Sequence, residues 1–486
     1  MPCLRLACCI ALVAASAAIP NAAAAAVLAV GQGYGGSPET ARAAARADLA
    51  VRLQRRAAMQ LDGASGKTAV AVQRAIAGGR ELPLIEIELA STGGSVAEVL
   101  YQARLTDASL AAYAREARRL AQGLRRLDST TSAASDAGNA LARLDQYLRI
   151  LAVLALFSPA SQPEFEFDEA LFWSSAAKNL SPAGGAKDVA LRVKQEVKQA
   201  GARHCRIIAP VRADTAEVTA LSASIADGLV GGAGGAARDE SPACTLDGRY
   251  TQRDGRLVLA LFLLDASFNT QRAFVYVLPA VAEHRSPALS APSGLAATLG
   301  RGLVRVDLPG GTAASSSAGA MNVDVRMGRG NRALYYRPGQ RDKLLVKLDR
   351  AGYYYIVGHV QKEAERFSYL LEIGEPGSSE RFVRRVAADL AHRWQTAVEF
   401  TVEAPVGLEA VQVFATSEPP QKMLPPTRFD PGRKLYLIGT DPVDAIKRAR
   451  GLVLVNVPDA RNEPGGKAKP AALTAGEAVL QFSTLP

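Results

Sequence analysis

The chain has 486 residues, a formal net charge of +10 at pH 7 and a hydrophobic content of 48%. This length exceeds what one hydrophobic core usually supports, so we expect about three domains. The charge is basic, but arginines are spread through every segment beside acidic residues, and no run of five or more like charges occurs. This pattern argues against a nucleic-acid-binding tail and favours an ordinary globular protein.

The N-terminus has the pattern of a secretory signal peptide at residues 1–25. Residues 1–5 are short and positive, residues 6–19 are apolar but too short to span a bilayer, and the alanines at 22–26 offer A-x-A cleavage sites. We therefore expect export to the periplasm, with the outer membrane as a second location. We also expect a mature chain that begins between Ala23 and Val27 and contains no transmembrane span.

Residues 26–128 predict an N-terminal α+β domain. Ser37 can cap a helix that begins with Pro38, and a second helix is expected from Thr106. Three strands are expected, at residues 27–30, 84–89 and 97–104. The glycine-x-glycine strand end followed by an alanine-rich helix resembles the N-terminal domain of the flagellar assembly protein T family and of related small outer-membrane lipoproteins. This resemblance covers roughly residues 26–124.

Residues 129–185 are expected to be a helical connector, and residues 186–289 a middle α+β domain. The middle domain should contain a helix at 186–200, a strand at 205–211, a helix capped near Asp214, and a three-stranded β-meander within 244–279. Its residues Leu246, Gly248, Tyr250, Leu264, Asp265 and Ala266 resemble a fold shared by curli-channel periplasmic domains, penicillin-binding-protein activators and flagellar protein T. The resemblance implies an envelope assembly factor and no enzyme.

Cys205 and Cys244 are the two cysteines that remain after the expected signal cleavage. Each opens a predicted strand, and the resemblance implies that the two strands are neighbours in one sheet. Their Cα atoms could then lie within the roughly 7 Å that a disulfide tolerates. We expect a disulfide in an oxidising compartment. The alternative is two buried thiols that serve as small hydrophobic residues.

Residues 290–319 are expected to be a linker, and residues 320–486 a β-rich C-terminal domain with a tail. Leu344, Val346 and Leu348 alternate with polar residues as in a half-buried strand, and the tyrosines from Tyr353 begin a second strand after a turn. The two strands together predict an antiparallel hairpin. The run MNVDVRMGRGNRALYYRPGQRDKLLVKLDRAGYYYIVGHV and the later APVGLEAVQVFATSEP resemble the domain of unknown function 4384 family, which has no agreed catalytic residues.

The aromatic residues of this predicted hairpin are the candidate binding residues of the chain. Tyrosine combines contact area with a polar group, so the rings could form a face that binds a partner. The alternative is that most of these rings belong to the core. The candidates are Tyr335, Tyr336, Tyr353, Tyr354 and Tyr355.

The motifs that suggest chemistry lack the context which that chemistry needs. Residues 31–36 fit G-x-G-x-x-G, but no second parallel strand ending in an acidic residue follows. The four histidines are scattered, and the acidic cluster at residues 164–169 lacks the glycine turn of a calcium loop. We therefore expect no catalytic residue, no cofactor and no metal.

The sequence thus predicts an α+β protein of three modules, with antiparallel β-meanders packed by helices and a β-rich C-terminal domain. The expected function is that of a non-enzymatic exported accessory factor, which binds an envelope or outer-membrane protein and no nucleic acid. Peptidoglycan is a second candidate ligand. The alternative function is a cell-wall polymer hydrolase, or the regulatory subunit of one.

Overall fold

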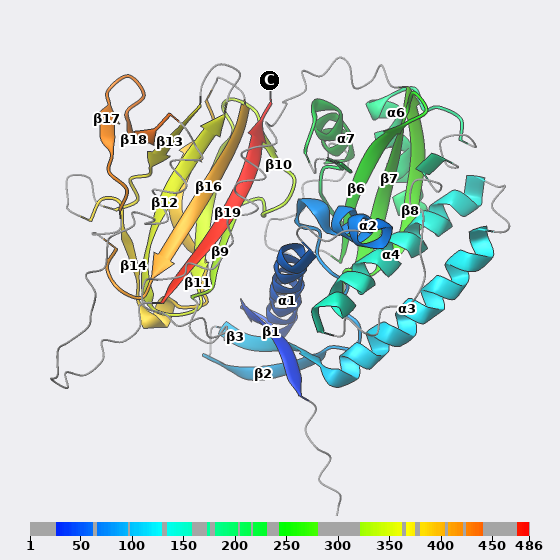
Figure 1. The fold of residues 1–486 in the computed structure, drawn as a ribbon, viewed down its shortest axis with the longest axis horizontal. Coiled ribbons are helices and arrows are strands. Elements are labelled where there is room, and N and C mark those ends of the chain that lie inside the picture. The colour runs from blue at the N-terminus through cyan, green and yellow to red at the C-terminus, as the bar shows by residue number, and fades with distance from the viewer. Residues whose placement is uncertain are drawn as a thin grey trace, which may run out of the picture.

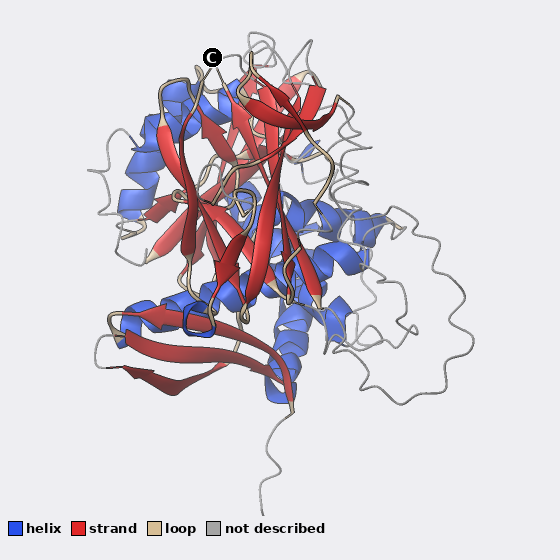
Figure 2. Cartoon of the chain, turned by 90° about the vertical axis from the view of Figure 1, so that its left-hand side faces the viewer, coloured by secondary structure: helices blue, strands red, loops and turns tan. Residues whose placement is uncertain are grey.

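The computed structural model describes residues 26–61, 66–95, 98–128, 134–157, 173–174, 180–202, 205–214, 217–230, 243–279, 321–361, 366–374, 380–403, 407–420, 424–440 and 474–485. These residues form four sheets and six α-helices (Figures 1 and 2), which confirms the predicted α+β class. We refer to residues 26–157, 180–279 and 321–485 as the N-terminal, middle and C-terminal modules. The predicted signal peptide, the linker at 290–319 and the acidic cluster at 164–169 lie outside the described residues.

The N-terminal module contains an antiparallel three-stranded sheet with helix α1 packed on it. Ser37 caps α1 as expected, because its Oγ accepts a hydrogen bond from the Thr40 amide at 3.3 Å. The strand predicted at 84–89 begins later, since the amide of Leu84 donates to Ser267 of the middle module instead of a neighbouring strand. The elements are β1 (Val27–Gly35), α1 (Pro38–Leu61), β2 (Glu88–Ser95) and β3 (Glu98–Thr106).

The first two glycines of the G-x-G-x-x-G motif, Gly31 and Gly33, allow α1 to pack closely against β1. A Cβ atom on Gly31 would lie 2.3 Å from the Leu49 amide nitrogen, and one on Gly33 would lie 2.1 Å from the Ala45 amide nitrogen. Only glycine permits this approach of the two backbones. The sheet is antiparallel, so it also lacks the parallel strand pair of a dinucleotide-binding fold.

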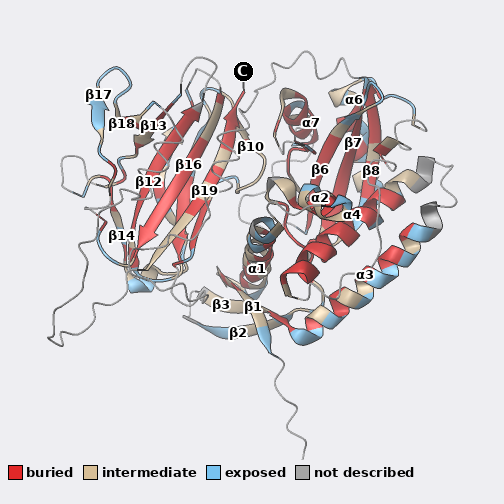
Figure 3. Cartoon of the chain, in the orientation of Figure 1, coloured by how far each residue is buried: buried red, intermediate tan, exposed pale blue. Residues whose placement is uncertain are grey.

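Helix α4 is a central core element and does not act as a connector. Its apolar side chains pack against α1, α2 and α3 on the N-terminal side and against β8 of the middle module. Figure 3 shows that most of the helix is buried. One hydrophobic core therefore continues from the N-terminal module into the middle module. The remaining helices of this region are α2 (Lys67–Ile76), α3 (Asp107–Asp128) and α4 (Ala134–Phe157).

The middle module contains the predicted meander, with β6, β7 and β8 paired antiparallel in succession. Helices α6 and α7 pack on the face opposite α4. The residue that caps α7 is Thr219, whose Oγ1 accepts from the Ser222 amide, and not the predicted Asp214. The elements are α6 (Ala186–Gln199), β4 (Cys205–Ile207), β5 (Val211–Arg212), α7 (Ala220–Val230), β6 (Cys244–Arg253), β7 (Arg256–Asp265) and β8 (Thr270–Pro279).

The C-terminal module is a β-sandwich of two sheets that share one core. The smaller sheet has the order β15-β11-β9, and its strands are β9 (Val323–Met327), β11 (Arg341–Leu348) and β15 (Gln395–Thr401). The larger sheet has the order β10-β19-β16-β12-β13-β18-β17, with β14 beside β12. Its strands are β10 (Leu334–Tyr336), β12 (Gly352–Gln361), β13 (Arg366–Leu370), β14 (Arg384–Val386), β16 (Gly407–Thr416), β17 (Arg428–Asp430), β18 (Leu435–Gly439) and β19 (Ala475–Thr484).

The predicted hairpin of β11 and β12 is wrong. The two strands are consecutive but belong to opposite sheets, so the turn between them crosses from one layer of the sandwich to the other. The alternation that predicted two strands is correct, because Leu344 and Val346 of β11 face Tyr354 and Ile356 of β12 across the core. Alternation identifies the buried face of a strand but does not identify its neighbour.

No helix among the described residues is both long enough and apolar enough to cross a membrane.

Candidate functional site

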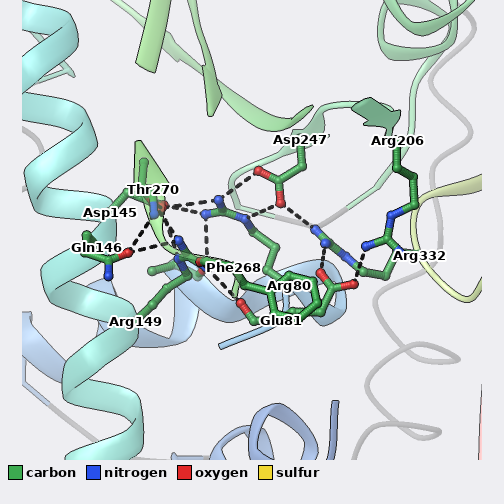
Figure 4. A network of polar contacts seen from close by, with 11 residues as sticks. Arg80, Glu81, Asp145, Gln146, Arg149, Arg206, Asp247, Phe268, Thr270 and Arg332 are labelled. Atoms are coloured by element: carbon green, nitrogen blue, oxygen red, sulfur yellow. Dashed lines mark hydrogen bonds and ion pairs between the residues drawn. The ribbon is translucent and has the colours of Figure 1, made fainter. Parts of the chain in front are cut away.

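Arg80 lies where the N-terminal and middle modules meet, and its guanidinium is fully buried. Its Nε and Nη2 donate to Asp247 of β6 at 3.0 and 2.9 Å, and its Nη1 donates to Asp145 of α4 at 2.5 Å (Figure 4). Its guanidinium carbon also lies 4.8 Å from the ring centroid of Phe262. Arg80 thus joins the segment after α2 to α4 and to the middle sheet.

The same carboxylates extend the network to the C-terminal module (Figure 4). Arg332, between β9 and β10, donates to Asp247 Oδ2 at 2.9 Å and forms an ion pair with Glu81. Arg206 of β4 donates to the other oxygen of Glu81 at 2.7 Å. One connected set of ion pairs therefore links all three modules, and we call it the junction network: Arg80, Glu81, Asp145, Arg149, Arg206, Asp247 and Arg332.

The attraction between the carboxylates and the arginines of the junction network decides which of its groups are ionised. Burial alone would raise the pKa of Asp247, but the positive charges of Arg80 and Arg332 outweigh burial and hold that pKa well below its usual range. The pKa of Asp145 and that of Glu81 are lowered for the same reason, by Arg80 and by Arg332 respectively. All three acids are thus carboxylates at neutral pH, and their charges fix which side chains can meet at the junction.

Arg149 extends the network to the turn that leads into β8. It donates through Nε to Asp145 at 3.1 Å and through Nη1 to the backbone oxygens of Glu81 and Phe268 at 2.8 and 2.9 Å. Its Nη2 donates to the hydroxyl of Thr270, which in turn donates to Asp145 at 2.8 Å. The turn that leads into β8 is therefore fixed on its buried side by the charged side chains of Arg149 and Asp145.

A cleft of about 710 Å³ opens directly in front of that turn. Its walls are α3 and α4, and its ends are residues 84–86 and 269–271, so both the N-terminal and the middle module contribute. Gln146 lies between the network and the cleft: its Nε2 donates to Asn269 Oδ1 and its Oε1 accepts from the Thr270 amide, both at 2.9 Å. A cleft of this size between modules is the kind of place where proteins bind ligands.

Three arginines line the cleft. Arg115 forms an exposed ion pair with Glu86 at 3.1 Å, and Arg119 forms one with Glu116 at 2.6 Å. Arg143 of α4 has no carboxylate partner among the residues that the structure describes. The cleft therefore combines positive side chains with pre-arranged amide groups at one end, which suits a ligand that carries negative charge.

A second contact between modules places Lys347 where the sequence did not predict it. The alternation of β11 predicted an outward Lys347, but its Nζ donates to Asp48 of α1 at 2.7 Å and lies 3.0 Å from Asp324 of β9. Arg55 of α1 also pairs with Asp324. Helix α1 therefore covers the outer face of the small sheet around Lys347 and Asp324, whereas Lys343 and Glu399 on the same face are exposed.

The five candidate tyrosines do not form a common binding face. Tyr336, Tyr354 and Tyr355 have exposed fractions of 0%, 0% and 2% and belong to the cores of the sandwich, as the alternative interpretation held. Tyr335 is half-buried and donates to Asp227 of α7 at 2.7 Å, so it contacts the middle module. Tyr353 is half-buried in β12. The prediction of a tyrosine binding face is wrong for the buried rings, because the strands place them between or against sheets.

The predicted disulfide between Cys205 and Cys244 is present, with a Cα–Cα distance of 4.4 Å. The two residues are direct partners in the parallel pairing of β4 with β6. The expectation that their strands are neighbours is therefore correct. The bridge holds β4 and its Arg206 beside the junction network.

His359 and Ser368 form a hydrogen bond of 2.7 Å between Nδ1 and Oγ, which the sequence did not predict. The imidazole Nε2 lies 3.0 Å from Gln412 Oε1. Both His359 and Ser368 are fully buried, so a substrate cannot reach the hydroxyl in this structure. We interpret the pair as a polar contact within the large sheet.

Among the described residues, no group of three or more histidine, cysteine, aspartate or glutamate side chains has the arrangement of a metal site.

Comparison with known proteins gives little further information. No family model matches the chain, and no curated protein matches it. Among solved structures, the chain is similar to the secreted protein HP1454 of the human pathogen Helicobacter pylori, with 12% sequence identity and a TM-score of 0.23. The similarity covers 49% of this chain and 81% of that chain. A TM-score this low establishes neither a shared fold nor a shared function.

The junction network and the cleft were not predicted from the sequence. Their residues come from seven separate segments, and an isolated arginine or aspartate on an amphipathic helix or strand usually faces solvent. One local signal was present: Arg80 and Glu81 stand between a glycine turn and the apolar run LPLI, where a charged pair has little access to water. Arg149 is a second such signal, because it interrupts the apolar end of α4.

Proposed function

We propose that the protein is an exported, non-enzymatic accessory factor of an assembly in the cell envelope, and that it acts by binding a protein partner. The observation that carries this proposal is the cleft between α3 and α4, one end of which is fixed by the junction network. Such a pre-arranged surface reduces the entropy that a binding partner must lose.

The proposed location is the periplasm, with association to the outer membrane as a further possibility to test. The Cys205–Cys244 disulfide supports it, since disulfides persist in oxidising compartments. The signal-peptide pattern at residues 1–25 and the resemblances of residues 26–124 and 244–279 to envelope assembly factors support the same location.

Co-purification from the envelope fraction tests the function. The full-length protein, tagged at its C-terminus and expressed in the organism that produces it, should recover one protein partner in a fixed stoichiometry. Incubation of the same purified protein with isolated cell wall should release no soluble fragments. If the protein instead stays monomeric and releases wall fragments, that result would identify it as a hydrolase or as a subunit of one.

A further inference from the structure

We propose that the cleft between α3 and α4 binds a peptide segment that carries carboxylates. This inference rests on the proposed binding function and names the chemistry of the partner. It is carried by three observations: the charge of the walls, the apolar residues in the lining, and the fixed amides at one end.

The charge of the walls favours an anion. Three arginines reach the cleft against the two acids Glu86 and Glu116, so the excess is positive. Arg143 is the arginine without a carboxylate partner among the described residues, and a guanidinium can bind a carboxylate with two parallel hydrogen bonds. The ion pairs of Arg115 and Arg119 are exposed, and exposed pairs contribute little free energy. A ligand carboxylate can therefore replace Glu86 or Glu116 at small cost.

The apolar residues that line the cleft favour a peptide over a small inorganic anion. Leu84, Leu120 and Ala142 are buried side chains whose surfaces also line the cleft. A phosphate ion would leave this surface without a partner, whereas an aliphatic side chain next to an acidic one would cover it.

The amides at the end of the cleft suit a peptide backbone. Gln146 is held on both sides by Asn269 and Thr270, so these groups keep one orientation. Asn139 and Gln271 add exposed amide side chains, and an amide can both donate to and accept from a peptide group.

The direct test uses a fluorescein-labelled hexapeptide of alternating glutamate and leucine and measures fluorescence anisotropy with the full-length protein at low salt. The wild type should bind it, and the R119Q/R143Q double variant should bind at least about tenfold more weakly, because it lacks two guanidiniums that can each donate charged hydrogen bonds to a carboxylate. Arg118→Gln is the matched control, because Arg118 is an exposed neighbour on α3 that does not line the cleft. Its affinity should stay within about twofold of the wild type, as expected for a surface change away from the site.

A variant with the opposite effect strengthens the test. Glu116→Gln removes the competitor of Arg119, so this variant should bind the peptide several-fold more tightly than the wild type. A loss of folding cannot produce a gain in affinity. A lysine–leucine hexapeptide should not bind, and inorganic phosphate at matched ionic strength should not displace the acidic peptide.

Three results would overturn the proposal. These are no binding of the acidic peptide by the wild type, an equal loss in R118Q and in R119Q/R143Q, and complete displacement by phosphate. The failure of the proposed function is distinguishable: if R119Q/R143Q recovers the envelope partner as well as the wild type does, the protein binds a partner elsewhere and only the cleft assignment fails.

Discussion

Asp247 shows how one side chain can fix the arrangement of three modules. Its two oxygens accept from Arg80 of the N-terminal module and from Arg332 of the C-terminal module, while its backbone belongs to β6. A buried ionic network of this kind often adds little net stability, because the charges lose their hydration. Its main effect is selective, since any other docking of the modules would leave a buried charge without a partner.

Replacement of Asp247 by asparagine should therefore destabilise the protein strongly. The amide keeps the shape but removes the charge that both arginines require, and breaking a buried pair typically costs about 3–5 kcal/mol. Urea unfolding followed by circular dichroism measures the loss. Asp254→Asn is the matched control, because Asp254 is exposed in the β6–β7 turn and asparagine tolerates its positive φ. Equal stabilities of the two variants would contradict the role given to Asp247.

The pH dependence of stability should come from the same carboxylates. The pKa values of Asp247, Asp145 and Glu81 are lowered in the folded protein. Their contribution is complete above the unfolded pKa near 4 and is lost as the pH falls below it. The free energy of unfolding should thus decrease steeply as the pH falls below about 4 in the wild type, and less steeply in D247N. Parallel curves for the two proteins would show that Asp247 is not ionised in the folded state.

At the scale of elements, the packing of α1 on β1 depends on two glycines, and the position of β4 depends on a disulfide. In both features, a short sequence signal depends on a contact with a residue of another element. Gly33 is adjacent to Ala45, and Cys205 is joined to Cys244 across 39 positions. Each can be tested by a substitution that leaves the other elements unchanged.

Replacement of Gly33 by alanine should destabilise the N-terminal module. The added Cβ would lie 2.1 Å from the Ala45 amide nitrogen, so strand and helix must separate, and such overpacking costs about 1–3 kcal/mol or more. Gly36→Ala is the matched control, because nothing lies within 4 Å of a Cβ at that position. Thermal unfolding of both variants measures the difference. If G33A and G36A had the same unfolding temperature, that result would contradict the close approach of the two backbones.

Removal of the disulfide should lower stability by about 4 kcal/mol in the chain-entropy model for a loop of this length. The double variant C205A/C244A should therefore unfold at lower urea concentration than the oxidised wild type. Under reducing conditions the two proteins should unfold together. A double variant as stable as the oxidised wild type would mean that the bridge does not constrain the unfolded chain. Mass spectrometry of a non-reduced digest should show the two cysteine peptides joined.

What could be predicted from the sequence was mainly local. The cap at Ser37, the meander of β6 to β8 and the pairing of Cys205 with Cys244 follow from turn residues, alternation and compartment. The partner of β12 could not be predicted in the same way, because alternation is the same whether a strand pairs with its neighbour in sequence or crosses to another sheet.

The candidate site could not be predicted from local sequence patterns for a different reason. Its walls and its network come from segments separated by up to 251 positions, as for Glu81 and Arg332. The helical spacing of α3 and α4 identified their buried faces but gave no reason to place Arg119 and Arg143 beside one cleft. The sequence left both roles of the tyrosines open, because tyrosine suits both a core and a surface, and only the sandwich decides between them.

At the scale of the whole molecule, three groups of polar contacts between described residues help to dock the C-terminal sandwich on the other two modules. These are Arg332 with Glu81 and Asp247, Lys347 with Asp48, and the pair Tyr335 and Arg337 with Asp227. The N-terminal and middle modules share one hydrophobic core. The described modules therefore form one body, which presents the cleft in a fixed shape.

The central claim is that the protein functions by binding a partner in this cleft, and site-specific photo-crosslinking in the producing cells tests it most directly. A photoreactive amino acid at Asn139, which lines the cleft, should crosslink to one envelope polypeptide. The same amino acid at Gln122, which is exposed on α3 and does not line the cleft, should give no such product. Crosslinking from Gln122 but not from Asn139, or from neither position, would contradict the claim.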